Sequence, residues 1–217
     1  MTGAELYVKK VLSGELIAGE KVVKACKRFK KDMNNPDFVF NKQEAENIVI
    51  FFEKVLRHWE GKWRGTPIGL SLFQKFILQN LYGWETKDGR LRYTTSYIEV
   101  ARKSAKTILA AGCALYDLIR GRDLSPQILI GANNEDQAKI CTQCCGKLIE
   151  TSPILSRMIS TKGDSSHEKP INLYKREGRC YSIIYNDGIR DGFIKSMSKD
   201  PDTKDGFNPS KYIIDEY

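Results

Sequence analysis

The sequence has few of the residues that bind metal ions and no stretch suited to a membrane. Only two histidines occur among 217 residues, and no apolar run approaches the roughly 20 residues that a membrane-spanning helix needs. The first residues also lack the basic and then apolar pattern of a secretory signal. These absences favour a protein that works inside the cell and has no membrane partner.

Six cysteines are present, and three of them lie together in the segment Cys141-Thr-Gln-Cys144-Cys145. Two thiolates at this spacing can share a zinc ion, but a structural zinc site needs four ligands and the chain has no second cysteine pair. The surrounding residues show helical periodicity, which places Cys141 and Cys145 on one face of a helix. We therefore expect reduced cysteines that pack in the core.

Positive charge is in excess, because 35 Lys and Arg residues stand against 27 Asp and Glu residues, a net charge of +8. An excess of this size favours a polyanionic partner, with nucleic acid ahead of an anionic membrane.

The periodicity of the apolar residues changes along the chain. Residues 4–60 and 70–84 have helical spacing, with Asn41 as an expected N-cap, whereas residues 91–100 are rich in β-branched and aromatic residues and predict a strand. A helix to about Arg120, a short strand around 127–131, a helix over 134–152 and several short strands from Ile171 onward follow. This order predicts an α/β fold with a mainly parallel sheet flanked by helices and an α-helical segment before it.

The predicted strand at 91–100 and the helix after it meet in a loop that ends in Lys106-Thr107. A phosphate-binding loop of the pattern G-x-x-x-x-G-K-[ST] turns backbone N–H groups toward an anion at a helix N-terminus. Here Val100 and Ala105 occupy the glycine positions, but the last two residues are intact, so Lys106 is expected to reach the β- and γ-phosphates and Thr107 to ligate Mg²⁺. The alternative is a basic turn whose lysine is simply solvated. A methyl group at Ala105 is harmless at negative φ and costs about 1 kcal/mol or more at positive φ.

The last segment is an apolar run followed by two acids, Tyr212-Ile213-Ile214-Asp215-Glu216. In nucleoside triphosphatases the first acid of such a strand holds Mg²⁺ and the second polarises the attacking water. The alternative is a surface strand that ends in two solvated carboxylates. Because the loop and the acidic strand occur in the correct order with strands between them, together they predict an ATPase core with a fold of the P-loop NTPase type.

Three segments resemble a known family. The segment Ala101-Arg102-Lys103-Ser104-Ala105-Lys106-Thr107 is similar to the degenerate phosphate motif of tailed-bacteriophage terminase large subunits, "LFQKFILQNLYGW" (72–84) to their upstream aromatic and glutamine segment, and "KYIIDEY" (211–217) to their Walker B motif. The chain thus resembles the N-terminal ATPase half of that family over nearly its whole length. It departs at Ala105, where the family usually has glycine.

The resemblance implies a role for each matching residue. Arg102 would touch the γ-phosphate, Gln74 would hydrogen-bond the adenine edge, Asp215 would support Mg²⁺ and Glu216 would activate water. The ATP phosphates would be bound by Ala101, Arg102, Lys103, Ser104, Ala105, Lys106 and Thr107. The alternative for Gln74 is an exposed helix residue. Phe73, Phe76, Leu81 and Trp84 are expected to be core residues. Arg190 is a candidate for an arginine finger acting in trans, or else an arginine of a turn.

The same resemblance implies the ATPase motor of a phage terminase, which would hydrolyse ATP to drive double-stranded DNA into proheads in the host bacterial cytoplasm. Its expected partners are the DNA, the terminase small subunit, the portal protein and further copies of itself in a ring. Residues 1–68 would form the helical segment and 69–217 the ATPase core, with the nuclease domain of the family absent from these residues. The alternatives are a helicase-like DNA-dependent ATPase and a non-enzymatic nucleic-acid-binding domain with a decayed loop.

Overall fold

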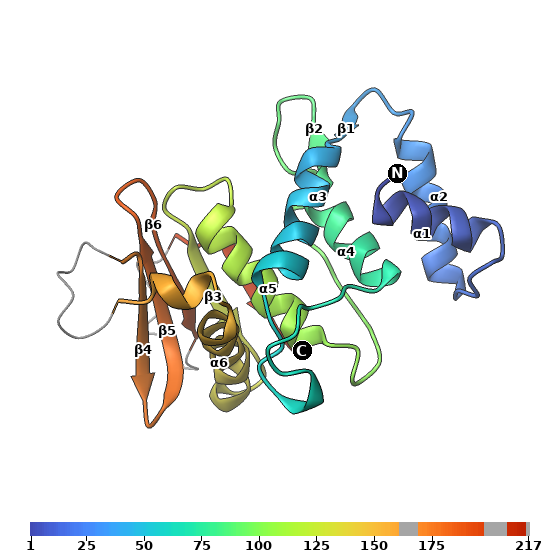
Figure 1. Cartoon of the computed structure of the whole chain (residues 1–217). Coiled ribbons are helices and arrows are strands. Elements are labelled where there is room, and N and C mark those ends of the chain that lie inside the picture. Colours follow the sequence, from blue (N-terminus) through green and yellow to red (C-terminus); the bar gives the residue numbers. More distant parts are fainter. Residues whose placement is uncertain (161–168, 198–207, 216–217) are drawn as a thin grey trace. The chain divides into compact units, whose positions relative to one another are not determined.

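The computed structural model describes residues 1–160, 169–197 and 208–215, which belong to two compact units. Unit 1 comprises Met1–Lys54 and Ile68–Glu99, and unit 2 comprises Val55–Pro67 and Val100–Tyr217 (Figure 1). Within the described part of the chain, no helix combines the length and the apolar character that spanning a membrane requires.

Unit 1 is mostly helical, as the periodicity predicts. Its elements are α1 (Gly3–Leu12), α2 (Glu20–Asp32), β1 (Phe38–Phe40), α3 (Lys42–Ile50), α4 (Leu72–Gly83) and β2 (Trp84–Thr86), with the π-helical segment η1 (Phe51–Val55) directly after α3. The strands β1 and β2 pair in antiparallel orientation. Asn41 caps α3 as expected, because its side chain accepts a hydrogen bond from the Glu44 N–H at 3.2 Å.

The core of unit 1 is aromatic. Trp84 is fully buried, and its ring lies 5.4 Å from that of Phe29 and 5.1 Å from that of Phe40. Phe76 is half-buried and packs against the same cluster, so the prediction of a core residue is confirmed for Trp84. Burying such large apolar surfaces together stabilises this unit, with an added contribution from the edge-to-face geometry.

Unit 2 contains a five-stranded sheet. Its elements are η2 (Gly61–Trp63), α5 (Lys106–Arg120), β3 (Gln127–Gly131), α6 (Glu135–Thr151), η3 (Leu155–Met158), β4 (Ile171–Arg176), β5 (Arg179–Asn186), β6 (Asp191–Ser196) and β7 (Lys211–Ile214). The strand order is β4-β5-β6-β3-β7, and β3 is parallel to both β6 and β7. The β4–β5 and β5–β6 pairs are antiparallel, so the sheet is mixed and not mainly parallel.

The antiparallel pairs follow from short connections. Only Glu177 and Gly178 separate β4 from β5, and both have positive φ, 51° and 74°. A two-residue turn of this kind makes a hairpin, whereas a parallel connection needs a crossover of a dozen or more residues.

The strand predicted over 91–100 is not formed. Apart from an isolated bridge between Leu91 and Glu85, this segment has no strand pairing in the structure. Tyr97 is 83% exposed and Ile98 43% exposed, so their β-favouring side chains have no pleated surface to pack on.

Helices α5 and α6 pack against each other and against the sheet (Figure 1). Cys141 and Cys145 are fully buried on α6, as the helical spacing predicts, and the Cys145 Sγ–H donates to the Ala111 carbonyl of α5 at 3.7 Å. Gly146 allows α6 to approach β5, since a Cβ there would lie 2.7 Å from Cβ of Cys180. Burial raises the pKa of Cys145 well above its usual range, so this thiol stays protonated.

Candidate phosphate-binding site

The loop before α5 has the backbone conformation that glycines usually provide. Ala105 is the N-cap residue of α5 and adopts the left-handed conformation, with φ 58° and ψ 33°, and Lys103 also has positive φ, 66°. Between them, the Ser104 N–H donates to the Ala101 carbonyl at 3.3 Å and closes a turn. The sequence left open whether Ala105 has negative or positive φ. The structure shows positive φ, a strained conformation that costs about 1 kcal/mol for a residue with a Cβ.

The N-terminus of α5 is open toward this loop. Its N-cap residue, Ala105, provides no side-chain cap, and the first N–H groups of a helix have no partner within the helix. Lys106 and Thr107 form its first turn and are half-buried, whereas Ala101, Arg102 and Lys103 are exposed. A fifteen-residue helix places partial positive charge at this end, so the loop and the first turn together suit an anion.

Thr107 lies beside Asp215, the first acid after β7. The Thr107 hydroxyl donates to Oδ2 of Asp215 at 3.1 Å, although 108 positions separate the two residues. The Asp215 N–H donates to the Gly131 carbonyl at 2.9 Å, which ties the acid to the carboxyl end of β3. The two half-motifs of the sequence therefore meet at the carboxyl edge of two parallel strands, where α/β proteins bind their ligands.

A second contact joins the same two elements farther along. Lys211, the first residue of β7, forms an ion pair with Asp117 of α5. Burial alone would lower the pKa of Lys211, but the Asp117 carboxylate outweighs it and the pKa is raised. Lys211 is therefore charged at neutral pH, and α5 is fixed to β7 at two points.

The oxygen atoms of Thr107 and Asp215 fit a magnesium ion. Hydroxyl and carboxylate oxygens are the hard ligands that Mg²⁺ prefers, and it usually takes one or two protein carboxylates together with phosphate oxygens and waters. Glu216, the residue predicted to activate water, lies outside the described residues.

The sequence made Gln74 a candidate for binding adenine and Arg190 a candidate arginine finger. In the structure, both side chains form hydrogen bonds to nearby residues. Gln74 lies in unit 1, in the first turn of α4, where its Oε1 accepts from the Ser71 N–H at 2.9 Å in a capping box. Arg190 donates from Nη2 to the Gly121 carbonyl at 2.7 Å and from Nη1 to the Asp123 carbonyl. Arg190 thus contacts the carbonyls that follow α5, as an arginine of a turn does. Its alternative role, an arginine finger acting in trans, stays a prediction.

Gly131 is a positioning residue that the sequence reasoning did not single out. Its carbonyl holds the Asp215 N–H, and a Cβ at this position would lie 3.2 Å from Cδ1 of Ile214. The available signal was a glycine at the end of the buried apolar run "QILIG", a place where a strand often allows a close backbone approach.

These features define a class of protein. A loop with left-handed residues at a helix N-terminus, opposite a carboxylate at the end of a parallel strand, is the arrangement with which α/β nucleotide-binding proteins bind phosphate. The family within this class follows from comparison, because the model of the terminase large subunit ATPase domain matches residues 72–217. The chain belongs to the ATPase-domain family of terminase large subunits.

A similar sequence and a similar solved structure both come from bacteriophage HK97. The chain is 27% identical over 173 residues to the large subunit of the terminase of Enterobacteria phage HK97, which covers 79% of this chain and 30% of that protein. The crystal structure of the HK97 bacteriophage large terminase has a similar fold, with a TM-score of 0.59 and 22% identity over 79% of this chain and 31% of that one. The chain therefore spans less than a third of the length of the relatives that it matches.

Proposed function

We propose that the loop 100–107 and Asp215 bind ATP together with Mg²⁺ and that the protein hydrolyses ATP as part of a DNA-packaging motor. The observation that carries the proposal is the hydrogen bond between Thr107 and Asp215, because it brings a phosphate-loop hydroxyl and a strand-end carboxylate to one point. Family membership supports the same assignment over the helicase-like alternative.

Each residue of the site has a role that its chemistry allows. The amides at the start of α5 would hold phosphate oxygens, and the Lys106 ammonium would neutralise the β- and γ-phosphates. Thr107 and Asp215 would hold Mg²⁺, which when bound offsets the negative charge that develops on the transferred phosphoryl group. Arg102, which is exposed, would reach the γ-phosphate, and Glu216 would activate the attacking water.

The proposed packaging function involves other molecules besides this chain. Hydrolysis would drive double-stranded DNA into proheads, with the terminase small subunit and the portal protein as partners and several copies of the motor in a ring. Residues 69–217 would form the ATPase core in this arrangement, with the helical residues 1–68 before it. The net charge of +8 is compatible with a DNA partner.

The test is ATP binding by the 217-residue chain with and without Lys106→Ala. Calorimetric titration with a non-hydrolysable ATP analogue and Mg²⁺ is expected to show at least about tenfold weaker binding for the variant, since a charge-assisted contact to phosphate is lost. Phosphate release from ATP is expected to fall with it.

The matched control is Lys147→Ala, which removes an exposed lysine of α6 that has no part in the proposed site. It should leave binding and phosphate release as in the original chain. If Lys106→Ala binds and hydrolyses ATP as well as the control does, the site is not an ATPase site, and a non-enzymatic nucleic-acid-binding domain becomes the better reading.

A further inference from the structure

Helix α2 carries a concentration of positive charge that the ATPase site does not use. Within thirteen residues it has six basic side chains against two acidic ones, a surplus of four, which is half of the net charge of the chain. The basic residues are Lys21, Lys24, Lys27, Arg28, Lys30 and Lys31.

The basic residues of α2 lie on the exposed side of the helix. All six basic residues are exposed, while Cys26, Phe29 and Asp32 are buried against the core of unit 1. At 1.5 Å of rise per residue, the basic face extends over about 15 Å from Lys21 to Lys31. Such a face has the length of several phosphate groups of a nucleic-acid strand.

The two acids of α2 neutralise little of this face. Glu20 pairs with Lys24 at 2.6 Å, and the carboxylate of Asp32 is turned inward to Arg92 at 2.8 Å. Within the described ranges 1–160, 169–197 and 208–215, the side chains of Lys27, Lys30 and Lys31 form no ion pair.

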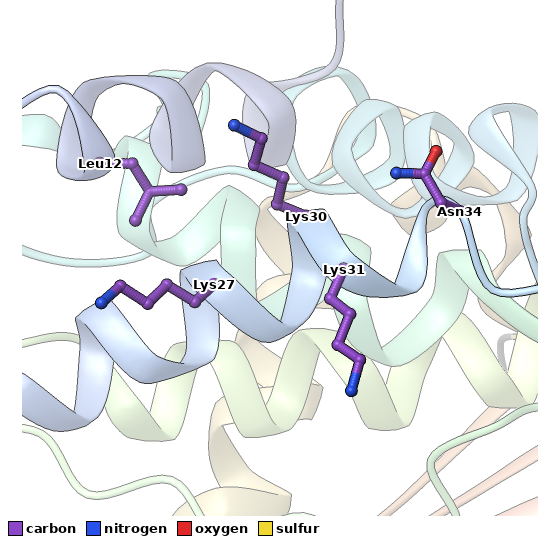
Figure 2. Close-up of a pocket in the computed structure, with 5 residues that line it drawn as sticks. All are labelled: Leu12, Lys27, Lys30, Lys31 and Asn34. Atoms are coloured by element: carbon purple, nitrogen blue, oxygen red, sulfur yellow. The ribbon is translucent and has the colours of Figure 1, made fainter.

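Lys27, Lys30 and Lys31 line a shallow hollow near the end of the helix. Figure 2 shows their side chains extending from α2 in different directions, with Leu12 of α1 and Asn34 at the borders of the hollow. Lys27 and Lys31 stand four positions apart, a spacing at which like charges repel and destabilise a helix. A bound polyanion would relieve this repulsion.

We propose that this basic face of α2 binds the phosphate backbone of duplex DNA. Lysines on flexible stems act as point charges that hold phosphates without reading bases. A single strand is the poorer fit, because proteins bind single strands by stacking bases on aromatic side chains and the one aromatic residue of α2, Phe29, is buried. The choice of DNA rests on the proposed packaging function, but the face lies in unit 1 and is separate from the phosphate loop of unit 2.

The test compares the full chain with the triple variant Lys27→Gln, Lys30→Gln, Lys31→Gln. Fluorescence anisotropy of a labelled 30-base-pair duplex, measured over a series of salt concentrations, reports both affinity and its salt dependence. The variant is expected to bind at least about tenfold more weakly, and the slope of log affinity against log salt is expected to fall by about 2 to 3, because three lysine–phosphate contacts are lost.

The control variant Lys62→Gln, Lys87→Gln, Lys147→Gln removes the same charge from exposed lysines outside α2 and should keep the original slope. Circular dichroism should confirm that all three proteins are folded. The proposal is overturned if the α2 variant and the control bind the duplex equally, or if α2 substitution weakens binding only to vesicles of anionic lipid. ATP-analogue binding, measured on the same variants, should be unchanged, so a failure of this proposal is distinct from a failure of the ATP site.

Discussion

Thr107 and Asp215 lie 3.1 Å apart, from the hydroxyl oxygen to Oδ2, although one lies in the first turn of α5 and the other follows the last described strand. Each residue alone belongs to a weak sequence motif. The contact between them joins the motifs into one site. The effect of removing this contact should be measurable separately from the effect of removing the Lys106 charge.

Thr107→Val is expected to weaken Mg²⁺-dependent binding of an ATP analogue while leaving metal-free binding nearly unchanged. The substitution removes the hydroxyl that contacts Asp215 and leaves the shape of the side chain similar. It should also lower the free energy of unfolding by about 1 kcal/mol, the typical net worth of one hydrogen bond. Titration calorimetry with and without Mg²⁺ measures the first effect and urea denaturation the second. Thr107→Ser keeps the hydroxyl and should retain metal dependence; equal loss in both variants would argue against the hydroxyl's role.

Ala105→Gly is expected to stabilise the protein. Ala105 has φ 58°, where a Cβ costs about 1–2 kcal/mol, so its removal stabilises the folded state by that amount. The greater freedom of glycine in the unfolded chain offsets about 0.5–1 kcal/mol of this stabilisation. The net increase in the free energy of unfolding should be about 0.5–1 kcal/mol by urea denaturation. Ala110→Gly, in the interior of α5, is the matched comparison and should destabilise by about 1 kcal/mol. The same sign for both substitutions would contradict the left-handed conformation.

The buried ion pair of unit 1 should contribute far more than an exposed one. Asp32 and Arg92 are 2.8 Å apart with side chains 8% and 14% exposed, and the guanidinium lies 3.8 Å from the ring of Phe38. Asp32→Ala is expected to destabilise by about 3 kcal/mol, because it leaves a buried charge without its partner. Asp37→Ala, which breaks an exposed pair with Lys87, should change stability by less than about 0.5 kcal/mol. Comparable effects in urea denaturation would show that burial does not matter here.

Stability is expected to fall at alkaline pH because of buried thiols. Burial raises the pKa of Cys180 to about 11, above the value of roughly 8.5 for a free thiol. Since the folded pKa is the higher one, the stabilisation is complete below the unfolded pKa and is lost as pH rises from about 9 to 11. Cys180→Ala should reduce this loss by about 1–2 kcal/mol in urea denaturation with a reductant present. Ile183→Val, a packing change without a titratable group, should keep the original pH dependence; if Cys180→Ala does so too, the thiol is not responsible.

Local sequence signals predicted the helices and the core well. Asn41 has an oxygen that can cap a helix, and Trp84 follows an amphipathic run, so each is placed by chemistry close to it in the sequence. The meeting of Thr107 and Asp215 was predictable for another reason, namely that parallel strands bring their carboxyl ends to one edge.

Features that depend on distant partners were not predictable in the same way. The segment 91–100 has strand-favouring residues, but β-propensity reports how a side chain fits a neighbouring pleated surface, and this segment has none. The short turn at Glu177–Gly178 could have shown that β4 and β5 are antiparallel. The prediction of a mainly parallel sheet followed the overall α/β order of elements instead. Alanine prefers negative φ, so the presence of alanine at position 105 gave no indication of the left-handed conformation that the structure shows.

The two contacts between α5 and β7 have a mechanical consequence. Ten residues of helix from Thr107 to Asp117 extend about 15 Å. The four residues of strand between Lys211 and Asp215 extend about 13 Å beside it, with the chain running in the opposite direction. Because helix and strand are joined at both ends, neither can slide along the other without breaking a contact, so the Thr107 hydroxyl and the Asp215 carboxylate stay in register.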